Sequence, residues 1–202
     1  MKHAVMAGWI TAMVVWVAAV GAGLAGLASE AWRPGSPGRP AGRWPGETRV
    51  PRAGDRPDLV LVLHARCPCS RASLAELERL LAKARDRLAV HVVIARPGAG
   101  GSSGDLERRA GAIRGVGVIV DDGGDEARRF GAETSGHALL YDRSGALLFS
   151  GGITPARGHE GDNAGRDAIL ALISGDEANP GADVFGCPLS ASTARDRGEG
   201  GR

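Results

Sequence analysis

The sequence is poor in several residue types, and each shortage excludes a class of protein. It has 3 cysteines and 1 tyrosine among 202 residues, and aromatic side chains make up 4%. Three cysteines are too few for a disulfide-stapled scaffold. Nucleic-acid binding favours basic clusters interleaved with aromatic residues. Here a net charge of +2 is spread over interspersed arginine and acidic residues, so we expect no nucleic-acid partner.

The first 28 residues differ from the rest of the chain because they are almost entirely apolar. The stretch from Ala4 to Ala28 contains no charged residue. As a helix it would extend about 37 Å, which is enough to cross a bilayer. We therefore expect residues 1–28 to form a transmembrane anchor. The alternative is a cleaved signal peptide ending at Gly26-Leu27-Ala28, although the apolar core of such peptides spans only about 7–15 residues.

The charges beside this apolar run give conflicting indications of its orientation. Lys2 and the amino terminus favour an N-terminus that stays in the cytoplasm. Arg33, Arg39 and Arg43 follow the run closely and favour the opposite orientation by the positive-inside rule. Redox-active cysteines suit an oxidising compartment. We therefore expect a membrane-anchored domain on the periplasmic or another extracytoplasmic side.

Proline and glycine divide the rest of the chain into segments. Residues 29–57 contain the run RPGSPGRP, which fits neither a helix nor a strand ladder. We expect this segment to be a tether. Residues 191–202 are polar and rich in glycine, and we expect a disordered tail there. The folded domain is accordingly predicted to span residues 58–190.

Within residues 58–190, apolar runs alternate with periodic stretches, as in an α/β domain. Leu59–Leu63 is a continuous apolar run, typical of a strand buried on both faces. The stretch up to Leu88 has leucines at helical spacing, and Asp142-Arg143-Ser144-Gly145 is typical of a hairpin turn. The other predicted strands are 90–95, 116–120, 137–141 and 146–149, and the other predicted helices are 105–113, 126–130 and 163–173. This order predicts a parallel-rich sheet with a hairpin at one side.

Two of the three cysteines lie in the turn between the first strand and the helix that follows. In Cys67-Pro68-Cys69, a cysteine before a helix faces unpaired N–H groups and the positive end of the helix dipole, which stabilise thiolate. Arg66 adds positive charge nearby. We interpret this turn as a nucleophile site; a structural disulfide, inert thiols and metal binding are the alternatives. Ser73 to Glu76 also fits a capping box, which would leave the cysteines in a loop.

The order of these elements resembles the thioredoxin superfamily, with a helix–strand insertion before the hairpin. Four blocks resemble the RedB-type bacterial group: Cys67–Ser70 (CPCS), Thr134–His137 (TSGH), Gly151–Thr154 (GGIT) and Arg157–Asn163 (RGHEGDN). The resemblance covers residues 58 to 190. It implies an α/β, thioredoxin-like fold with that insertion, preceded here by the N-terminal transmembrane helix.

The sequence departs from the thioredoxin pattern at two places. Thioredoxins carry Cys-x-x-Cys, whereas the spacing here is Cys-x-Cys, and Ser70 falls where the second cysteine usually lies. Thioredoxins also have a cis-proline before the hairpin strand, and this chain has Gly136 followed by His137 at that place. His137 is therefore a candidate base or ligand that faces Cys67, or else a structural histidine.

The loop of residues 157–163 gathers several polar side chains before the last helix. Asp162 is a plausible N-cap for that helix, but the loop holds more polar groups than one cap needs. In a thioredoxin-like fold this loop lies at the same end of the sheet as the cysteine turn. We therefore expect Arg157 and His159 to lie near Cys67, where they would stabilise thiolate or bind a substrate.

Together these features predict a thiol–disulfide oxidoreductase of the cell envelope that needs no cofactor. Cys67 would attack a disulfide of a partner protein or a small oxidant, and Cys69 or Cys187 would resolve the mixed disulfide. Cys187 lies in the C-terminal segment, where sequence alone does not give its position, so it can also be a bystander.

Two other functions fit the same residues. The first is a copper-binding or chaperone module that uses Cys67, Cys69 and Cys187 with His137 or His159 as ligands. The second is a thiol peroxidase, in which a thiolate reacts with peroxide bound by a cation of the polar loop.

Overall fold

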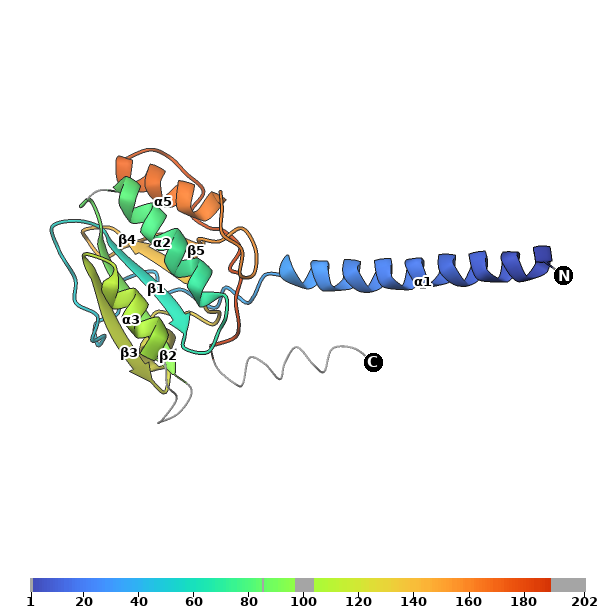
Figure 1. Ribbon diagram of the computed structural model, residues 1–202. Coiled ribbons are helices and arrows are strands. Elements are labelled where there is room, and N and C mark those ends of the chain that lie inside the picture. The colour runs from blue at the N-terminus through green and yellow to red at the C-terminus, as the bar shows by residue number, and fades with distance from the viewer. Residues whose placement is uncertain (1, 85, 97–103, 190–202) are drawn as a thin grey trace. The chain divides into compact units, whose positions relative to one another are not determined.

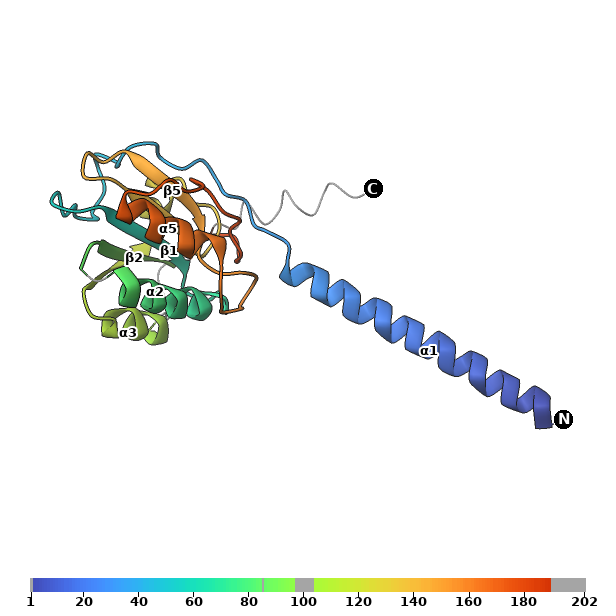
Figure 2. The same ribbon diagram turned by 90° about the horizontal axis from the view of Figure 1, so that it is seen from above.

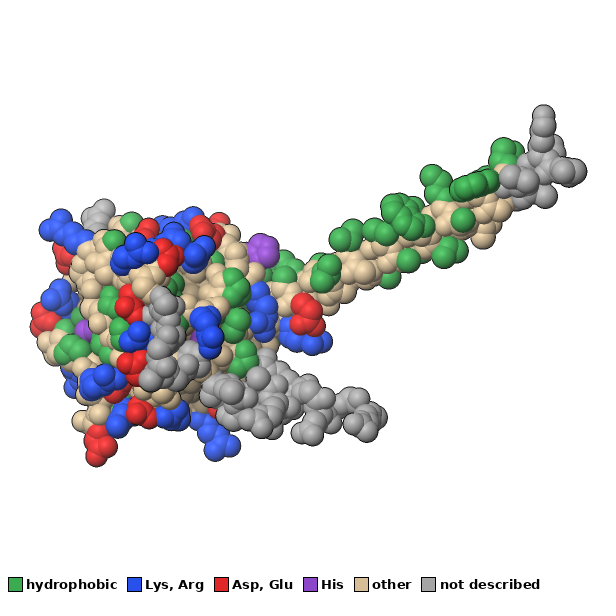
Figure 3. Space-filling model, turned by 60° about the horizontal axis from the view of Figure 1, so that its bottom comes forward, with side chains coloured by type: hydrophobic (Ala, Val, Ile, Leu, Met, Phe, Trp, Pro, Cys, Tyr) green, Lys and Arg blue, Asp and Glu red, His purple; other side chains and the backbone are tan. Residues whose placement is uncertain are grey.

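The computed structural model describes residues 2–84, 86–96 and 104–189, and the chain divides into two units at Arg33. The first unit is helix α1 (Lys2–Ala31). Its part from Gly8 to Ala31 is long and apolar enough to cross a membrane, a property shared with signal sequences near an N-terminus. Hydrophobic side chains lie along the helix in Figure 3. The predicted tail, residues 191–202, lies outside the described residues.

The second unit is built on a five-stranded sheet with the order β3-β2-β1-β4-β5. Strands β1, β2 and β3 are parallel, and the hairpin of β4 and β5 pairs antiparallel with β1. The strands are β1 (Asp58–His64), β2 (Ala89–Arg96), β3 (Val116–Asp122), β4 (His137–Tyr141) and β5 (Leu147–Gly152). All of β1 except His64 is buried, which explains its uninterrupted apolar sequence.

Three helices cover one face of this sheet, as Figures 1 and 2 show. They are α2 (Ser70–Ala84), α3 (Gly104–Ala112) and α5 (Ala164–Ser174). Leu74, Leu77 and Leu80 of α2 pack in one core with the leucines of β1. The predicted helical stripe is therefore present, although α2 ends at Ala84 rather than at Leu88.

The other face of the sheet is covered by the short helix α4 (Asp125–Arg129) and by the segment of residues 34–57. We expected this segment to be a free tether, and that expectation is wrong from Pro34 onward. The Trp44 ring contacts the rings of Phe130 and Tyr141 edge-on, with centroids 5.3 and 5.2 Å apart. The segment forms no helix or strand, as its proline and glycine predict. It is nevertheless a packed strap, because its aromatic ring is partly buried and its main chain finds partners on the domain.

Main-chain hydrogen bonds hold the strap along its length. The N–H of Ala41 donates to the Phe130 carbonyl at 3.2 Å, and that of Trp44 donates to the Gly145 carbonyl at 2.8 Å. The Tyr141 hydroxyl donates a hydrogen bond to the Ala41 carbonyl at 3.0 Å.

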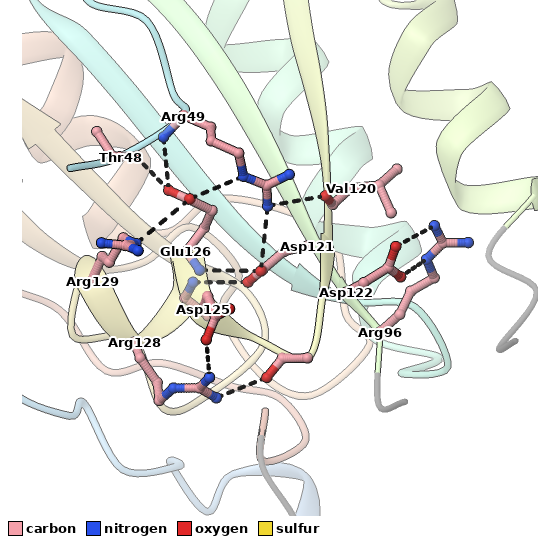
Figure 4. A network of polar contacts seen from close by, with 12 residues as sticks. Thr48, Arg49, Arg96, Val120, Asp121, Asp122, Asp125, Glu126, Arg128 and Arg129 are labelled. Carbon is pink, nitrogen blue, oxygen red and sulfur yellow. Dashed lines mark hydrogen bonds and ion pairs between the residues drawn. The ribbon is translucent and has the colours of Figure 1, made fainter. Parts of the chain in front are cut away.

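A buried acidic pair fixes the end of the strap to α4, as Figure 4 shows. The Asp121 carboxylate accepts hydrogen bonds from the N–H groups of Glu126 and Ala127 at 3.1 and 2.9 Å, so it satisfies two donors in the first turn of α4. Glu126 in turn accepts from the Thr48 hydroxyl and, at 3.2 Å, from the Arg49 guanidinium. Hydrogen bonds from α4 and the strap, together with the Arg49 charge, therefore compensate two carboxylates that would be costly to bury alone.

This topology is the thioredoxin-like fold that the sequence predicted. The element order β1–α2–β2, then the hairpin and α5, carries the insertion α3–β3 before the hairpin, and the inserted strand β3 lies at the edge of the sheet beside β2.

Trp44→Ala tests whether the strap is part of the folded domain. Loss of the half-buried indole should lower the free energy of unfolding by about 2–3 kcal/mol, measured by urea denaturation of the full chain in detergent. Trp32→Ala is the matched control, because Trp32 is 64% exposed and lies in the first unit. Equal stability of the two variants would show that the strap does not contribute to folding.

Candidate active site

The cysteine turn joins the end of β1 directly to α2. The Ser70 N–H donates to the Cys67 carbonyl at 3.1 Å, and the Ser73 N–H donates to the Cys69 carbonyl at 3.2 Å. Cys69 therefore accepts the first hydrogen bond of the helix, and α2 begins at Ser70. The alternative start at the Ser73 capping box is excluded, so both cysteines lie at the N-terminus of α2 rather than in a free loop.

The structure brings all three cysteines together around the sulfur of Cys67. The thiols of Cys69 and Cys187 donate hydrogen bonds to this sulfur, and the backbone N–H groups of the same two residues donate to it as well. Cys67 is 5% exposed, whereas Cys69 and Cys187 are half-buried, and all three are free thiols. A buried sulfur surrounded by donors is an environment that favours the thiolate.

These hydrogen bonds lower the pKa of Cys67 to about 4, with the Cys69 thiol as the largest cause. Burial acts in the opposite direction, because it disfavours the charged form, but the donors outweigh it. The hydrogen bond to Cys67 raises the pKa of Cys69 well above its ordinary value. Burial, followed by the hydrogen bond to Cys67, raises the pKa of Cys187 to about 11. At neutral pH the site therefore holds one thiolate and two thiols.

The source of this stabilisation agrees with our prediction only in part, because the Cys69 N–H at the start of α2 is one of the donors but the Arg66 charge is not among the causes. Arg66 is exposed and acts on His64, whose pKa is lowered by burial first, with the Arg66 charge adding to that effect. The Cys67 charge opposes it, which places His64 beside the thiolate as a neutral ring. The Arg66 N–H donates to His64 Nδ1 at 3.3 Å. Thiol and backbone donors, rather than the Arg66 charge, lower the pKa of Cys67.

The register of the sheet places the polar loop at the same end of the sheet as the cysteine turn. Val62 of β1 pairs with His137 of β4, which pairs with Gly152 of β5. The chain leaves β5 at Gly152 and enters the loop of residues 157–163 close to the end of β1. A Cβ built on Gly158 would lie 4.0 Å from Cys69 Sγ.

The two candidate residues of this loop have different positions. The Arg157 charge lowers the pKa values of Cys69 and Cys187, against the larger effects that raise them. Its Nη1 donates to the Gly186 carbonyl at 2.5 Å. His159 is exposed, and its Nδ1 lies 2.8 Å from the Arg157 carbonyl oxygen. The structure therefore places Arg157 at the thiols, whereas the hydrogen bond of His159 is to the loop itself.

His137, the other candidate base, is fully buried on β4. Its Nε2 lies 2.7 Å from Ser150 Oγ on the neighbouring strand, and burial lowers its pKa to about 4. The imidazole is therefore neutral and hydrogen-bonded within the hairpin, which is the structural alternative that the sequence left open.

We expected Asp162 to be the N-cap of α5, and this prediction is wrong. The N-cap is Asn163. The Asn163 side chain accepts a hydrogen bond from the Arg166 N–H at 2.8 Å. Asp162 is fully exposed and pairs with the Arg166 guanidinium at 2.9 Å. The reason is register, because α5 begins at Ala164 and the cap must directly precede it.

Glu76, whose role was not predicted, links this loop to α2. Glu76 is fully buried, and its carboxylate accepts from the Gly161 N–H at 2.7 Å and from the Arg166 guanidinium at 2.5 Å. The sequence pattern placed Glu76 in the Ser73 capping box, and the signal for its actual role was an acidic residue within the apolar stripe between Leu74 and Leu77. It anchors the polar loop to the same helix that positions Cys69.

Ser135 is a second residue whose role was not predicted. Its Oγ accepts from the His64 N–H at 2.9 Å and lies 3.1 Å from Ser70 Oγ. Its N–H donates to the Cys187 carbonyl at 2.8 Å. Ser70, which stands where thioredoxins have a second cysteine, donates to the His64 carbonyl at 3.0 Å. These serines hold the end of β1 and the Cys187 segment in one place.

An open cleft beside Cys67 gives a route to the turn. Its volume is about 490 Å³, and its lining residues are Ala65, Arg66, Cys67, Pro68, Arg71, Asp105 and Leu106. Arg71 and Asp105 form an ion pair at 3.1 Å across this lining. Arg66 adds an exposed positive charge to the opening.

Among the described residues, no group of three His, Cys, Asp or Glu side chains has an arrangement that could hold a metal ion. The three cysteine sulfurs interact through hydrogen bonds instead.

Solved structures share this fold. A hypothetical protein from Sinorhizobium meliloti is 22% identical, with 67% of this chain and 80% of that chain covered and a TM-score of 0.54. An uncharacterized conserved protein from Geobacillus kaustophilus is 16% identical, with 79% and 92% covered and a TM-score of 0.54. The exposed lipoprotein thioredoxin of Streptococcus pneumoniae is 20% identical, with 59% and 84% covered and a TM-score of 0.42. At these identities the two likenesses with a TM-score of 0.54 show the fold alone. No protein-family profile and no curated protein matches the chain.

The two thiol donors can be tested through the alkylation rate of Cys67. In a Cys69→Ser, Cys187→Ser variant the hydroxyls still donate, so the iodoacetamide rate should stay nearly flat from pH 6 to 9 because Cys67 is already ionised. In the matched Cys69→Ala, Cys187→Ala variant both side-chain donors are lost, and the Cys67 pKa should rise. An ordinary thiol gains about tenfold in rate per pH unit below its pKa of about 8.5. Such a profile in the serine variant would contradict a stabilised thiolate.

Proposed function

We propose that this protein is a thiol–disulfide oxidoreductase with Cys67 as its nucleophile. The observation that carries the proposal is the convergence of two thiols and two backbone N–H groups on the buried Cys67 sulfur. This environment stabilises the reactive thiolate and keeps a second thiol within reach of it. On the four sequence blocks quoted above, we also assign the chain to the RedB-type group.

In the proposed reaction the Cys67 thiolate attacks one sulfur of a partner disulfide. The partner S–S bond breaks, one partner sulfur leaves as a thiolate that takes up a proton, and the other is joined to Cys67 in a mixed disulfide. A second cysteine of the site then attacks Cys67 Sγ and releases the remaining partner sulfur as a thiol. The partner disulfide is reduced, and two thiols of this protein become a disulfide. The same steps run in reverse when the partner is a dithiol.

The surroundings of Cys67 suit a disulfide substrate. The cleft lined by Arg66 and Arg71 offers an entrance for one end of a disulfide substrate.

Oxidation of the purified protein with oxidised glutathione tests the proposal. The protein should lose two free thiols and the mass of two hydrogens, and dithiothreitol should restore both. The Cys67→Ala variant should not react with glutathione in this way, and it should not accelerate the reduction of insulin by dithiothreitol. Three thiols that survive the treatment would contradict the proposal. Stoichiometric copper in the purified protein, together with those surviving thiols, would support the copper module instead.

We further propose that α1 anchors the domain in a membrane, with the domain on its extracytoplasmic side. The apolar length of α1 supports the anchor, and cysteine chemistry suits that compartment. Alkaline carbonate extraction should leave the full chain in the membrane pellet, and N-terminal sequencing should find the first residues intact. A soluble protein that begins near Ser29 would instead indicate a cleaved signal peptide.

A further inference from the structure

The C-terminal segment that carries Cys187 is built into the domain next to β5. Residues 180–182 follow this strand, with a bridge between Ser150 and Gly181 and a hydrogen bond from the Ser150 N–H to the Pro180 carbonyl at 2.9 Å. A Cβ on Gly152 would lie 2.4 Å from the Asp183 carbonyl oxygen, so the two backbones approach more closely than any side chain allows.

The same segment then crosses to the residues that precede β4. Ser135 donates its N–H to the Cys187 carbonyl at 2.8 Å, and the Leu189 N–H donates to the Glu133 carbonyl at 2.9 Å. Between them, Thr134 and Pro188 form an antiparallel bridge. A Cβ on Gly186 would lie 1.9 Å from the Ser135 carbonyl oxygen. These contacts give Cys187 one defined position against Cys67.

We infer that Cys187 is the resolving cysteine of the site, delivered to Cys67 by the C-terminal segment, and that Cys69 serves as a donor to the thiolate. This inference rests on the proposed oxidoreductase function and specifies which thiol closes the disulfide. The oxidised protein then contains a Cys67–Cys187 bond rather than a bond within the cysteine turn.

The position of Cys69 argues against it as the resolving thiol. Its carbonyl accepts the first hydrogen bond of α2, from the Ser73 N–H, so its backbone is fixed at the helix start. A disulfide between cysteines one residue apart closes a small, strained ring. Cys187 belongs to a separate segment, so a bond to Cys67 needs no change in the helix.

Arg157 lies beside the same segment. Its guanidinium donates to the Gly186 carbonyl at 2.5 Å, next to Cys187, and its charge lowers the pKa values of both neighbouring thiols. The attacking species in thiol exchange is the thiolate, so a nearby cation favours the attack.

The resolving step balances without a further reagent. The Cys187 thiolate attacks Cys67 Sγ of the mixed disulfide, the bond between Cys67 and the partner sulfur breaks, and the partner leaves as a thiolate. That thiolate takes up the proton that Cys187 gave up. Two electrons pass in total from the Cys67 and Cys187 sulfurs to the partner disulfide.

The experiment compares full-length Cys69→Ser and Cys187→Ser proteins treated with oxidised glutathione under identical conditions. Cys69→Ser should close to a Cys67–Cys187 bond without retained glutathione, as should the parent protein. Cys187→Ser should accumulate the Cys67–glutathione mixed disulfide at least about tenfold above Cys69→Ser, because its resolving thiol is gone. Intact mass and non-reducing peptide mapping measure both products.

The reverse pattern overturns the inference and leaves the proposed function standing. In that case Cys187→Ser would close to a Cys67–Cys69 bond, and Cys69→Ser would retain glutathione. If no variant forms a mixed or intramolecular disulfide, the oxidoreductase function itself fails, and the assignment of Cys187 fails with it. The same peptide maps of the parent protein identify the bond directly, so the test does not depend on the folding of any variant.

Discussion

A negative charge on a buried sulfur is the constraint that the rest of the site satisfies. Burial alone would raise the pKa of Cys67, because the low-dielectric interior disfavours thiolate. The charge is stable only while four donors from Cys69 and Cys187 surround the sulfur. Two of these donors belong to the helix start and two to the C-terminal segment. The nucleophile therefore exists only when the C-terminal segment is packed against the start of α2.

That requirement explains contacts that would otherwise look unrelated. Ser135 binds both the end of β1 and the Cys187 carbonyl, so one residue sets the distance between the turn and the C-terminal segment. Gly152 and Gly186 permit backbone approaches that no other residue allows. Glu76 holds the loop of Arg157 to α2, and Arg157 holds Gly186. Each contact acts on the donors of the thiolate rather than on the thiolate itself.

The sequence predicted the strands and helices whose residues follow a local periodicity. It did not predict the segments whose position depends on packing between parts that are distant in the chain. The apolar run at Leu59–Leu63 and the helical leucines around Leu77 identified β1 and α2, because burial imposes a pattern on neighbouring residues. From that topology followed the position of the loop at Arg157. Cys187 had no such pattern, because its segment is held mainly by main-chain contacts, and the glycines that permit them do not show which segment will approach. The strap around Trp44 was mistaken for a tether because the residues that its side chains contact, Phe130, Tyr141 and Glu126, lie far away in the sequence.

The charge on Cys67 also controls when the other two thiols can react. The raised pKa values of Cys69 and Cys187 both come in part from their hydrogen bonds to the thiolate and from its charge. A mixed disulfide at Cys67 removes that charge and turns the sulfur into a weak acceptor. The two causes that come from the thiolate then disappear, while burial still raises both pKa values and the Arg157 charge still lowers them. The second thiol therefore becomes more acidic only after the first has reacted. The site thus has one thiolate at a time. Reaction of the Cys67 thiolate lowers the pKa of the second thiol, which can then attack.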